Sequence, residues 1–429
     1  MTAYNSPIKI WFINHSSYFP EDGPHIRHYG LGKYIARDGF EPTVFTSNEL
    51  HHVGNKRIDT GRQLYKEKTK DGVRFFYIKT THCEKNDIKR VFNLLSFEIN
   101  AFRACVKLAK VYGKPQVFYA GCISPTSFIT GWILARRYRA KLILETRDII
   151  PEGFYKEGSK WQNSLLAKAC RLYMRKMYEK ADALVFSMSG GAQYLADQGW
   201  DRGHGGKIDL NSVYYINNGV DLDAYRHDVN EYVLPDEDLD DPSVFSVVYM
   251  GSIRLMHNIP FLIETAKALK ARGRNDIKLL IWGTGPEEAE IRRRLEEEKL
   301  DNFILKGFVD KKYIPSIASR GNLAILTTNL SCVNRYGASP NKLFDYLAAG
   351  LPVVVPSLLS DGLIRNNGVG LELDCPSGDE MADAIIRFAD MDKTEYETYR
   401  AHSRKLASTF SYETLSKELE RAIVNTLKG

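Results

Sequence analysis

Short apolar runs alternate with helical segments along this chain, and the pattern runs twice. The strand-like runs of the first half lie at residues 8–14, 41–47, 72–80, 116–122, 141–148 and 183–189. Segments with helical periodicity fall between several of these runs, at residues 25–40, 126–139 and 165–181. Strands that are apolar throughout and separated by helices predict a parallel sheet covered on both faces.

An irregular acidic segment, residues 221–243, ends the first series, and a second series follows it. Its strand-like runs lie at residues 245–251, 277–285, 302–309, 323–328 and 352–357. A chain of 429 residues is also long for a single core. We therefore predict an α/β protein with two doubly wound, Rossmann-like domains, residues 1–220 and 221–405, facing across a cleft. Residues 406–429 are expected to form a helix that packs back on the first domain. The Asp-rich triplets of the acidic segment are interpreted as a solvated linker, without a metal site.

The stretch GASPNKLFDYLAAGLPVVVPS, residues 337–357, predicts a capped helix followed by a buried strand. Ser339 is expected to cap the helix and Pro340 to be its first residue, where a missing N–H costs nothing. The free amides at a helix start attract anions. Lys342 adds a positive charge there, and Asp345 adds an acceptor one turn later. This stretch predicts a site for a phosphate beside a hydroxylated group.

Glycine-containing loops follow two strands of the second series. Gly251 and Arg254 come after the first, and Gly283 and Gly285 after the second. A lone Gly-x-Gly is a weak signal, and a simple strand-to-helix turn explains it equally well. Arg254 has a simpler alternative as a surface arginine.

In their order and spacing, these motifs resemble the retaining glycosyltransferases of family 4, which have the GT-B fold. The resemblance covers nearly the whole chain and includes YFPEDGPHIRHYGLGKYIARDGFEPTVFTS, NNGVDLDAY and SPNKLFDYLAAGLPVVV. The combination of DIIPE with SPNKLFDYLAAG is similar to the branch that builds bacterial surface polysaccharides.

The resemblance implies roles for individual residues. Arg254 and Lys342 would neutralise the diphosphate of a nucleotide sugar in place of a metal ion. Backbone amides after Ser339 would add hydrogen bonds, and Asp345 would accept from the ribose hydroxyls. The remaining implied donor contacts are Gly251, Gly283 and Gly285 in the loops, Phe308 and Val309 at the base, and Gly23 and Arg27 from the first domain.

Three positions depart from the family pattern. Gly337 stands where many relatives have an acid that contacts the donor sugar, which leaves that contact to Ser339 or Asn341. His257 replaces a lysine of the phosphate clamp. The histidine that many relatives have after the fifth strand is absent, and Asp148 is the residue expected to have a polar or catalytic role near the acceptor.

The implied activity is transfer of a hexosyl or N-acetylhexosaminyl group from a UDP-sugar to an acceptor hydroxyl, with retention of configuration. The acceptor would be a lipid-linked or free saccharide, and no metal or other cofactor is expected. A nucleotide-sugar 2-epimerase of the same architecture and a non-catalytic sugar- or nucleotide-binding subunit remain as alternatives.

The charge of the chain is uneven. Residues 51–150 carry 20 basic and 8 acidic side chains, and residues 88–114 interleave apolar with basic ones. This favours reversible docking on an anionic membrane through residues 88–114, although a helix with an ordinary core-facing side and solvated charges explains the stretch nearly as well. No nucleic-acid-binding motif is present. The chain lacks a recognisable signal peptide, and its six scattered cysteines suggest buried, reduced thiols, so we expect a cytoplasmic protein.

Overall fold

The computed structural model describes residues 6–50, 56–83, 88–122, 126–154, 159–254, 257–327, 334–337, 339–359 and 361–429. The chain forms two compact units. Unit 1 comprises residues 1–217 and 412–429, and unit 2 comprises residues 218–411. The first crossing thus falls after residue 217 where 220 was predicted, and the chain returns to unit 1 at Tyr412 where 406 was predicted. Residues 406–409 are the end of another helix, in unit 2.

Unit 1 contains an eight-stranded sheet in the order β10-β9-β8-β7-β1-β2-β6-β5. Every pair is parallel except β5 with β6. The strands of unit 1, including a small β3–β4 pair, are β1 (Ile8–Ile13), β2 (Phe40–Ser47), β3 (Glu49–Leu50), β4 (Lys56–Arg57), β5 (Tyr65–Lys70), β6 (Val73–Ile78), β7 (Val117–Cys122), β8 (Lys141–Thr146), β9 (Ala183–Phe186) and β10 (Val213–Tyr215). The predicted parallel sheet is confirmed. The sequence did not predict β5, because this polar edge strand has no apolar pattern.

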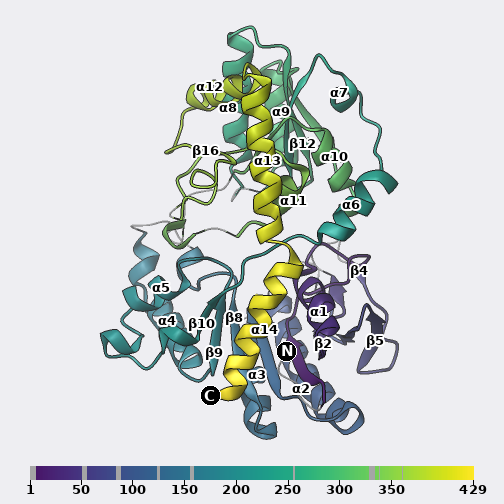
Figure 1. Cartoon of the computed structure of the whole chain (residues 1–429), viewed down its shortest axis with the longest axis vertical. Coiled ribbons are helices and arrows are strands. Elements are labelled where there is room, and N and C mark those ends of the chain that lie inside the picture. Colours follow the sequence, from purple (N-terminus) through teal and green to yellow (C-terminus); the bar gives the residue numbers. More distant parts are fainter. Residues whose placement is uncertain are drawn as a thin grey trace. The chain divides into compact units, whose positions relative to one another are not determined.

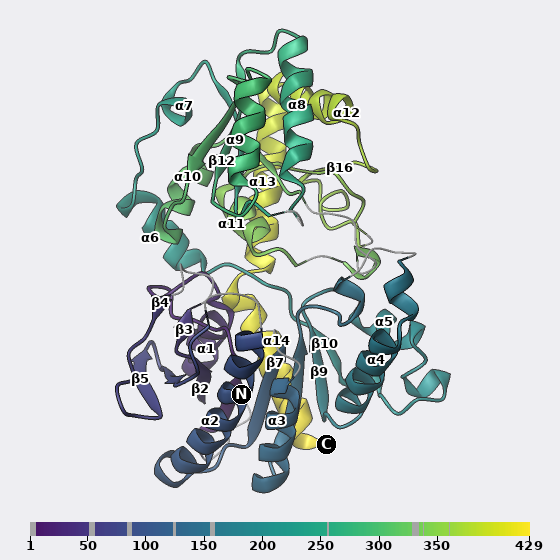
Figure 2. The same cartoon turned by 180° about the vertical axis from the view of Figure 1, so that it is seen from behind.

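Helices cover both faces of this sheet. They are α1 (Arg27–Arg37), α2 (Ile88–Tyr112), α3 (Thr126–Tyr138), α4 (Leu165–Tyr178), α5 (Gly191–Asp197) and α14 (Tyr412–Lys428). Figure 1 shows α1 and α14 in front of the sheet, and Figure 2 shows α2 and α3 in front of its opposite face. Helix α14 packs along α1, where the ring of Tyr412 would lie 2.4 Å from a Cβ atom placed on Gly30. The C-terminal helix is therefore part of the core of unit 1.

Unit 2 contains a six-stranded, fully parallel sheet in the order β13-β12-β11-β14-β15-β16. Its strands are β11 (Phe245–Met250), β12 (Ile277–Trp282), β13 (Phe303–Gly307), β14 (Leu323–Ile325), β15 (Val353–Val355) and β16 (Gly370–Glu372). Its helices are α6 (Leu222–Glu231), α7 (Glu237–Asp240), α8 (Ile259–Ala271), α9 (Glu288–Glu297), α10 (Ile314–Arg320), α11 (Asn341–Ala349), α12 (Gly378–Ala389) and α13 (Lys393–Thr409). Helices α8 and α12 lie side by side (Figure 2) and bury their apolar faces against the sheet.

The acidic segment 221–243 is not the irregular, solvated linker that the sequence suggested. It forms α6 and α7. The side chains of Asp236 and Asp238 are largely buried and pair with Lys306, and Asp238 also pairs with Lys278. The lysines come from β12 and β13, so the acidic residues neutralise charges on neighbouring strands.

The cysteines were expected to be buried, reduced thiols, and among the described residues this holds only in part. Cys83 and Cys105 are free and buried, whereas Cys375 is exposed. No helix in the described ranges is both long and apolar enough to cross a membrane.

Candidate functional site

In the sheet of unit 2, β12 and β13 follow β11 on one side, whereas β14, β15 and β16 lie on its other side. The point between β11 and β14 is a topological switch point, where doubly wound parallel sheets bind ligands. Loops after β11, β12 and β13 lie side by side here through backbone hydrogen bonds. The amide of Gly251 donates to the carbonyl of Trp282 (2.9 Å), and the amide of Gly283 donates to that of Gly307 (2.8 Å). The structure thus brings together the loops that carry most of the predicted donor residues.

Gly283 and Gly285 are required by this close backbone packing. A Cβ atom at Gly283 would lie 1.8 Å from the carbonyl oxygen of Gly251, and one at Gly285 would lie 1.9 Å from that of Ile253. Gly283 also has a φ of 149°, which disfavours a side chain. Both glycines are therefore explained by packing, and the loops that they hold form the edge of the site.

Lys342, in the first turn of α11, points to the same edge. Its Nζ donates to the hydroxyl of Tyr249 (2.7 Å) and lies 4.0 Å from the centre of that ring. A Cβ atom on Gly251 would lie 2.8 Å from this Nζ, so glycine leaves room for the lysine. Burial lowers the pKa of Lys342 to about 7. No carboxylate within the described ranges pairs with it, which leaves its charge available to an anion.

Two further nitrogen-bearing side chains lie near Lys342. Arg254 is exposed, and the described residues offer it no ion-pair partner. Burial and, after it, the charges of Lys342 and Arg254 lower the pKa of His257 to about 4. His257 is therefore neutral near pH 7, and the two positive charges close to it come from Arg254 and Lys342.

The start of α11 differs from the prediction by one residue. Pro340 occupies the cap position and the helix begins at Asn341, so the expectation that Ser339 caps it was wrong. The hydroxyl of Ser339 accepts instead from the backbone amide of Asn218 (3.3 Å), and the carbonyl of Ser339 accepts from the Asn218 side chain (2.7 Å). The cap residue Pro340 makes no side-chain hydrogen bond to the first turn of α11, whose amides can therefore bind an anion.

Asp345 lies one turn further along α11. Burial raises the pKa of its carboxyl group, an effect that the charge of Lys311 partly offsets. Within the part of the chain that the structure describes, this carboxylate accepts no hydrogen bond. Asp345 can thus receive hydroxyl donors from a ligand bound at the start of α11.

Phe308 and Val309 follow the end of β13. The side chain of Phe308 is 66% exposed, an unusual state for a phenylalanine in the loop of a packed domain. Gly307, just before it, has a φ of 78°, which turns the chain at this point. An exposed aromatic ring at the ligand-binding edge of a sheet offers a surface on which a planar base can pack.

Arg27, which was predicted to lie near the phosphates, is buried in unit 1 with its charge paired to a carboxylate of the same unit. Its side chain is 2% exposed, and its Nε donates to Glu145 (2.7 Å). Its terminal nitrogens donate to the backbone carbonyls of Ile216 (2.7 Å) and Asn217. The Glu145 carboxylate also binds His28 (3.1 Å), and although burial opposes ionisation, the charge of Arg27 and the contact with His28 hold its pKa well below the usual range. Arg27 thus anchors the last residues of unit 1 before the crossing.

The other predicted residues of unit 1 lie in loops. Gly23 is partly exposed and its amide donates to the carbonyl of Phe19 (3.2 Å). Asp148 is exposed just beyond the end of β8, and no described residue forms an ion pair with it. A carboxylate in this position is open to solvent and to an incoming substrate.

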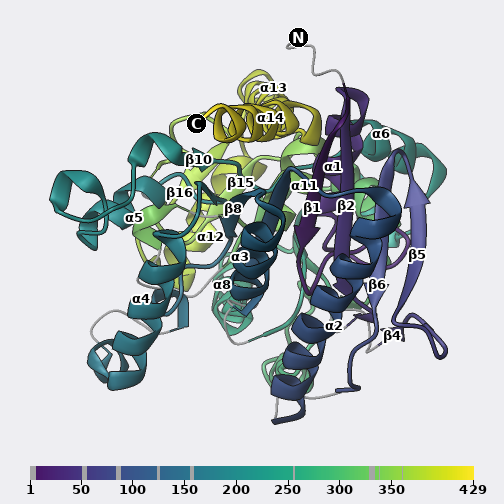
Figure 3. The ribbon, with the colours of Figure 1, turned by 90° about the horizontal axis from the view of Figure 1, so that it is seen from below.

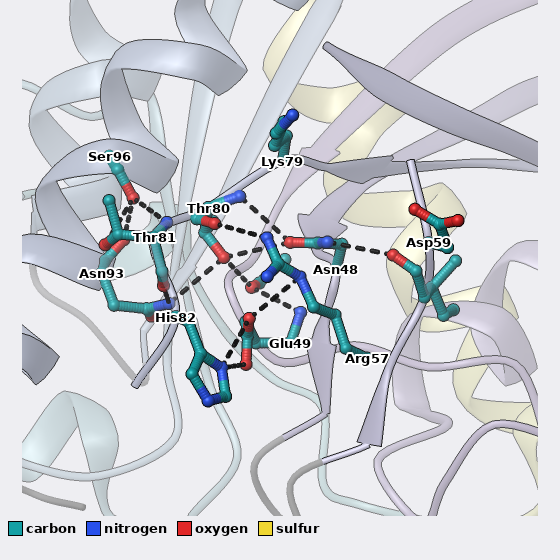
Figure 4. A network of polar contacts seen from close by, with 12 residues as sticks. Asn48, Glu49, Arg57, Asp59, Lys79, Thr80, Thr81, His82, Asn93 and Ser96 are labelled. Atoms are coloured by element: carbon teal, nitrogen blue, oxygen red, sulfur yellow. Dashed lines mark hydrogen bonds and ion pairs between the residues drawn. The ribbon is translucent and has the colours of Figure 1, made fainter. Parts of the chain in front are cut away.

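A polar cluster at the ends of β2 and β6 was not predicted (Figure 4). Glu49 is fully buried and pairs with Arg57 (3.2 Å) and His82 (3.2 Å). Nearby, the Asn48 side chain accepts from Thr80, joining the two strand ends. These groups satisfy one another and fix the β3–β4 pair against the sheet, so the cluster is structural.

Sequence reasoning missed the residues that position the predicted ones. Tyr249 supports Lys342, and Tyr346 accepts a hydrogen bond from the amide of Met250 (2.9 Å), which joins α11 to β11. Asn218 holds Ser339 from 121 positions away in the sequence. Tyr346 lies within the quoted stretch 337–357 and Tyr249 within the strand-like run 245–251, but a buried tyrosine in a strand or helix is interpreted first as part of the core.

Comparisons with known proteins bear on the family and the fold of the chain. Residues 244–391 match the family described as glycosyl transferases group 1. The alpha-D-kanosaminyltransferase of Streptomyces kanamyceticus is 28% identical over 174 residues, which cover 40% of this chain and 42% of that relative. The chain thus matches less than half of this relative's length.

Solved structures match over nearly the whole chain. A sucrose-phosphate synthase from Thermosynechococcus elongatus has a TM-score of 0.68 at 17% identity, covering 96% of this chain and 98% of its own. HepE of Anabaena, in complex with UDP and glucose, has a TM-score of 0.65 at 15% identity, covering 97% and 99%. The chain therefore has the GT-B fold, and the match to the glycosyl transferases group 1 family lies within its second unit.

Proposed function

We propose that this protein is a retaining glycosyltransferase that moves a hexosyl or N-acetylhexosaminyl group from a UDP-sugar to an acceptor hydroxyl. The observation that carries the proposal is the pair of positive charges close to His257, Arg254 and Lys342, which have no carboxylate partner among the described residues. Lys342 lies in the first turn of α11. A diphosphate brings the negative charge that this arrangement lacks. Neighbouring structures support the choice of nucleotide, since the matching Anabaena protein was solved with UDP and glucose.

The remaining donor contacts follow from the same edge of unit 2. Asp345 accepts the ribose hydroxyls one turn beyond the phosphates, and the base packs on Phe308 and Val309. Ser339 is engaged by Asn218, whereas the side chain of Asn341 is exposed. We therefore assign contact with the donor sugar to Asn341 in place of the missing acid at Gly337.

The proposed reaction breaks the bond between the anomeric carbon and the diphosphate and forms a bond to the acceptor oxygen on the same face. Arg254, Lys342 and the first amides of α11 stabilise the departing diphosphate, which is the main electrostatic task of the reaction. The acceptor proton passes to a phosphate oxygen of the leaving group. Asp148 orients the acceptor from unit 1. The acceptor is proposed to be a lipid-linked saccharide of a surface polysaccharide, in line with the DIIPE and SPNKLFDYLAAG motifs.

Product analysis tests this function against its alternatives. The protein is incubated with a mixture of UDP-sugars, with and without a lipid-linked saccharide, and the products are identified by mass spectrometry. A transferase adds one sugar to the acceptor and releases UDP in equal amount. Release of free sugar without an acceptor indicates an epimerase, and binding of UDP without turnover indicates a non-catalytic subunit.

The clamp is tested separately by calorimetry with UDP. Arg254→Ala is expected to weaken UDP binding about tenfold or more, the usual size for a hydrogen bond to a charged group. Lys393→Ala removes an exposed lysine of unit 2 that is distant in the sequence from Arg254 and Lys342, and it is the matched control.

We also propose that turnover persists after exhaustive treatment with EDTA. Activity that disappears and returns with magnesium would contradict the assignment of charge neutralisation to Arg254 and Lys342.

A further inference from the structure

Helix α2 has two apolar sides, and only one of them faces the core. Phe97, Ala101 and Leu108 are buried against the sheet of unit 1. On the opposite side, Phe92 is 58% exposed and Ile99 is 61% exposed. The exposed residues recur at the spacing of one helical face, which a core-facing helix would fill with polar side chains.

The neighbouring helices α3 and α4 lie on the same face of the sheet as α2 (Figure 3) and also carry exposed apolar residues. Ile133 of α3 is partly exposed, and Leu165 and Leu172 of α4 are 85% and 58% exposed. Among the described residues, twelve of the sixteen large, exposed apolar side chains lie on α2, α3, α4 or the short turn before α4. Single exposed apolar residues are common on soluble proteins, but a concentration of this kind marks an interaction surface. We define the α2–α4 apolar face as Phe92, Leu95, Ile99, Ile133, Leu165 and Leu172.

The charges around this face are almost all of one sign. The helices α2, α3 and α4 carry five, two and four lysine or arginine residues, and their single acidic residue is Glu98. Glu98 is buried and accepts hydrogen bonds from Thr126, Ser127 and Thr130. An apolar surface surrounded by basic side chains, with no exposed acid on these helices, is complementary to an anionic lipid bilayer. Two copies of the same face would instead bring like charges together.

Trp161 completes the pattern. It lies in the turn at Lys160–Asn163 that leads into α4, and its side chain is 69% exposed. Tryptophan beside lysine is typical of the boundary between lipid and water, where the ring lies among the headgroups. Lys160 and Lys168 are both exposed on either side of Leu165.

We propose that the α2–α4 apolar face inserts into the surface of an anionic membrane and holds unit 1 there reversibly. The sequence suggested docking through residues 88–114 alone, and the structure adds α3, α4 and Trp161. The proposal does not rest on the proposed glycosyltransferase activity, because it depends only on the exposed face of unit 1. A membrane-bound unit 1 would nevertheless bring the enzyme to a lipid-linked acceptor.

The test measures co-sedimentation of the full chain with phosphatidylcholine vesicles that contain phosphatidylglycerol, and with vesicles of phosphatidylcholine alone. Binding is expected to the anionic vesicles at low ionic strength and to weaken in about 1 M salt, where charges are screened beyond about 3 Å. The variant Phe92→Glu/Leu165→Glu is expected to reduce binding at least about tenfold. Val233→Glu is the matched control, because it also replaces an exposed apolar residue by glutamate but lies in unit 2. Far-UV circular dichroism and the melting temperature should be the same in all three proteins, which shows that unit 1 is folded in the double variant.

Fluorescence places the face in the bilayer. In the wild-type protein, brominated lipid is expected to quench part of the tryptophan emission. The quenched part should be absent from the Trp161→Phe variant. Equal binding by Phe92→Glu/Leu165→Glu and by the control would overturn the proposal. A second result would also overturn the proposal: a wild-type protein that self-associates without binding vesicles, together with a variant that is monomeric. The face would then join two copies of the chain. Binding of soluble glycerol phosphate in competition with the vesicles would show a headgroup site instead of an inserted face.

Discussion

Lys342 combines two opposed properties at the scale of a single residue. Its amine is largely surrounded by protein, and burial lowers its pKa from 10.5 to about 7. A buried amine with no carboxylate partner destabilises the folded protein, since burial disfavours its charged form. Its position over Tyr249 is therefore a cost to stability that an anionic ligand can offset.

Replacement of Lys342 by methionine is expected to separate stability from function. The melting temperature should rise by about 2–4 °C for each 1 kcal/mol recovered, while UDP binding falls about tenfold or more. The pH dependence follows from the same shift. The folded-state pKa lies below the unfolded one, so stability of the wild-type protein should rise between about pH 7 and 10.5, whereas UDP affinity should decline above pH 7 as the amine loses its proton. Calorimetric melting across this pH range measures the change in stability, and UDP titration across the same range measures the change in affinity. A Lys342→Met variant that is less stable than wild type and binds UDP normally would contradict the assignment.

Asp345 allows a second prediction for a single residue. If its carboxylate accepts the ribose hydroxyls, the wild-type protein should bind UDP more tightly than 2′-deoxy-UDP. Asp345→Asn should weaken UDP binding about tenfold or more and abolish the preference, because charge-assisted hydrogen bonds are lost. Asp374→Asn changes an exposed aspartate of unit 2 and serves as the control. The test is titration of both nucleotides against the three proteins, and a preference that survives in Asp345→Asn would remove this residue from the ribose site.

At the scale of elements, the site depends on loops held together by backbone contact. The Gly283→Ala variant would place a methyl group 1.8 Å from the carbonyl of Gly251, so the loops after β11 and β12 must move apart. We expect both lower stability and weaker UDP binding, because Gly251 lies against Lys342. Gly153→Ala in unit 1 is the control, because an added Cβ atom there would have no described heavy atom within 4 Å apart from its chain neighbours. Loss of stability with unchanged UDP affinity would show that this packing does not shape the site.

The same scale shows what the sequence could and could not predict. Runs that are apolar on both sides, such as IKIWFI and FSVVYM, predict buried parallel strands because the physical cause is local. The polar strand β5 escaped prediction because it has no apolar pattern. The helices α6 and α7 escaped prediction because residues distant in the sequence stabilise them, as Lys306 does for Asp236. The cap of α11 was misplaced for the same reason, since Asn218 occupies Ser339. Arg27 was assigned to a ligand because a sequence does not show that Glu145 is its partner.

At the scale of the whole molecule, the chain does not finish where its second unit ends. It returns to unit 1, where α14 buries residues such as Leu415, Leu419 and Ile423. The proposed phosphate clamp belongs wholly to unit 2, from Gly251 to Asp345. Stability of unit 1 and binding of the nucleotide should therefore respond to different substitutions.

The full-length variant Leu419→Asp tests this separation. Leu419 is fully buried, so a carboxylate at this position should release α14 from α1, at a cost of several kcal/mol. Hydrogen exchange followed by mass spectrometry is expected to speed up in α1 and α14, while the exchange of β11, β12 and α11 and the affinity for UDP stay unchanged. Lys417→Ala removes exposed ion pairs with Asp38 and Glu420, each worth no more than about 1 kcal/mol, and should leave both measurements as in wild type. If Leu419→Asp abolishes UDP binding while α1 keeps its protection, the nucleotide contacts depend on the last helix and the clamp is not confined to unit 2.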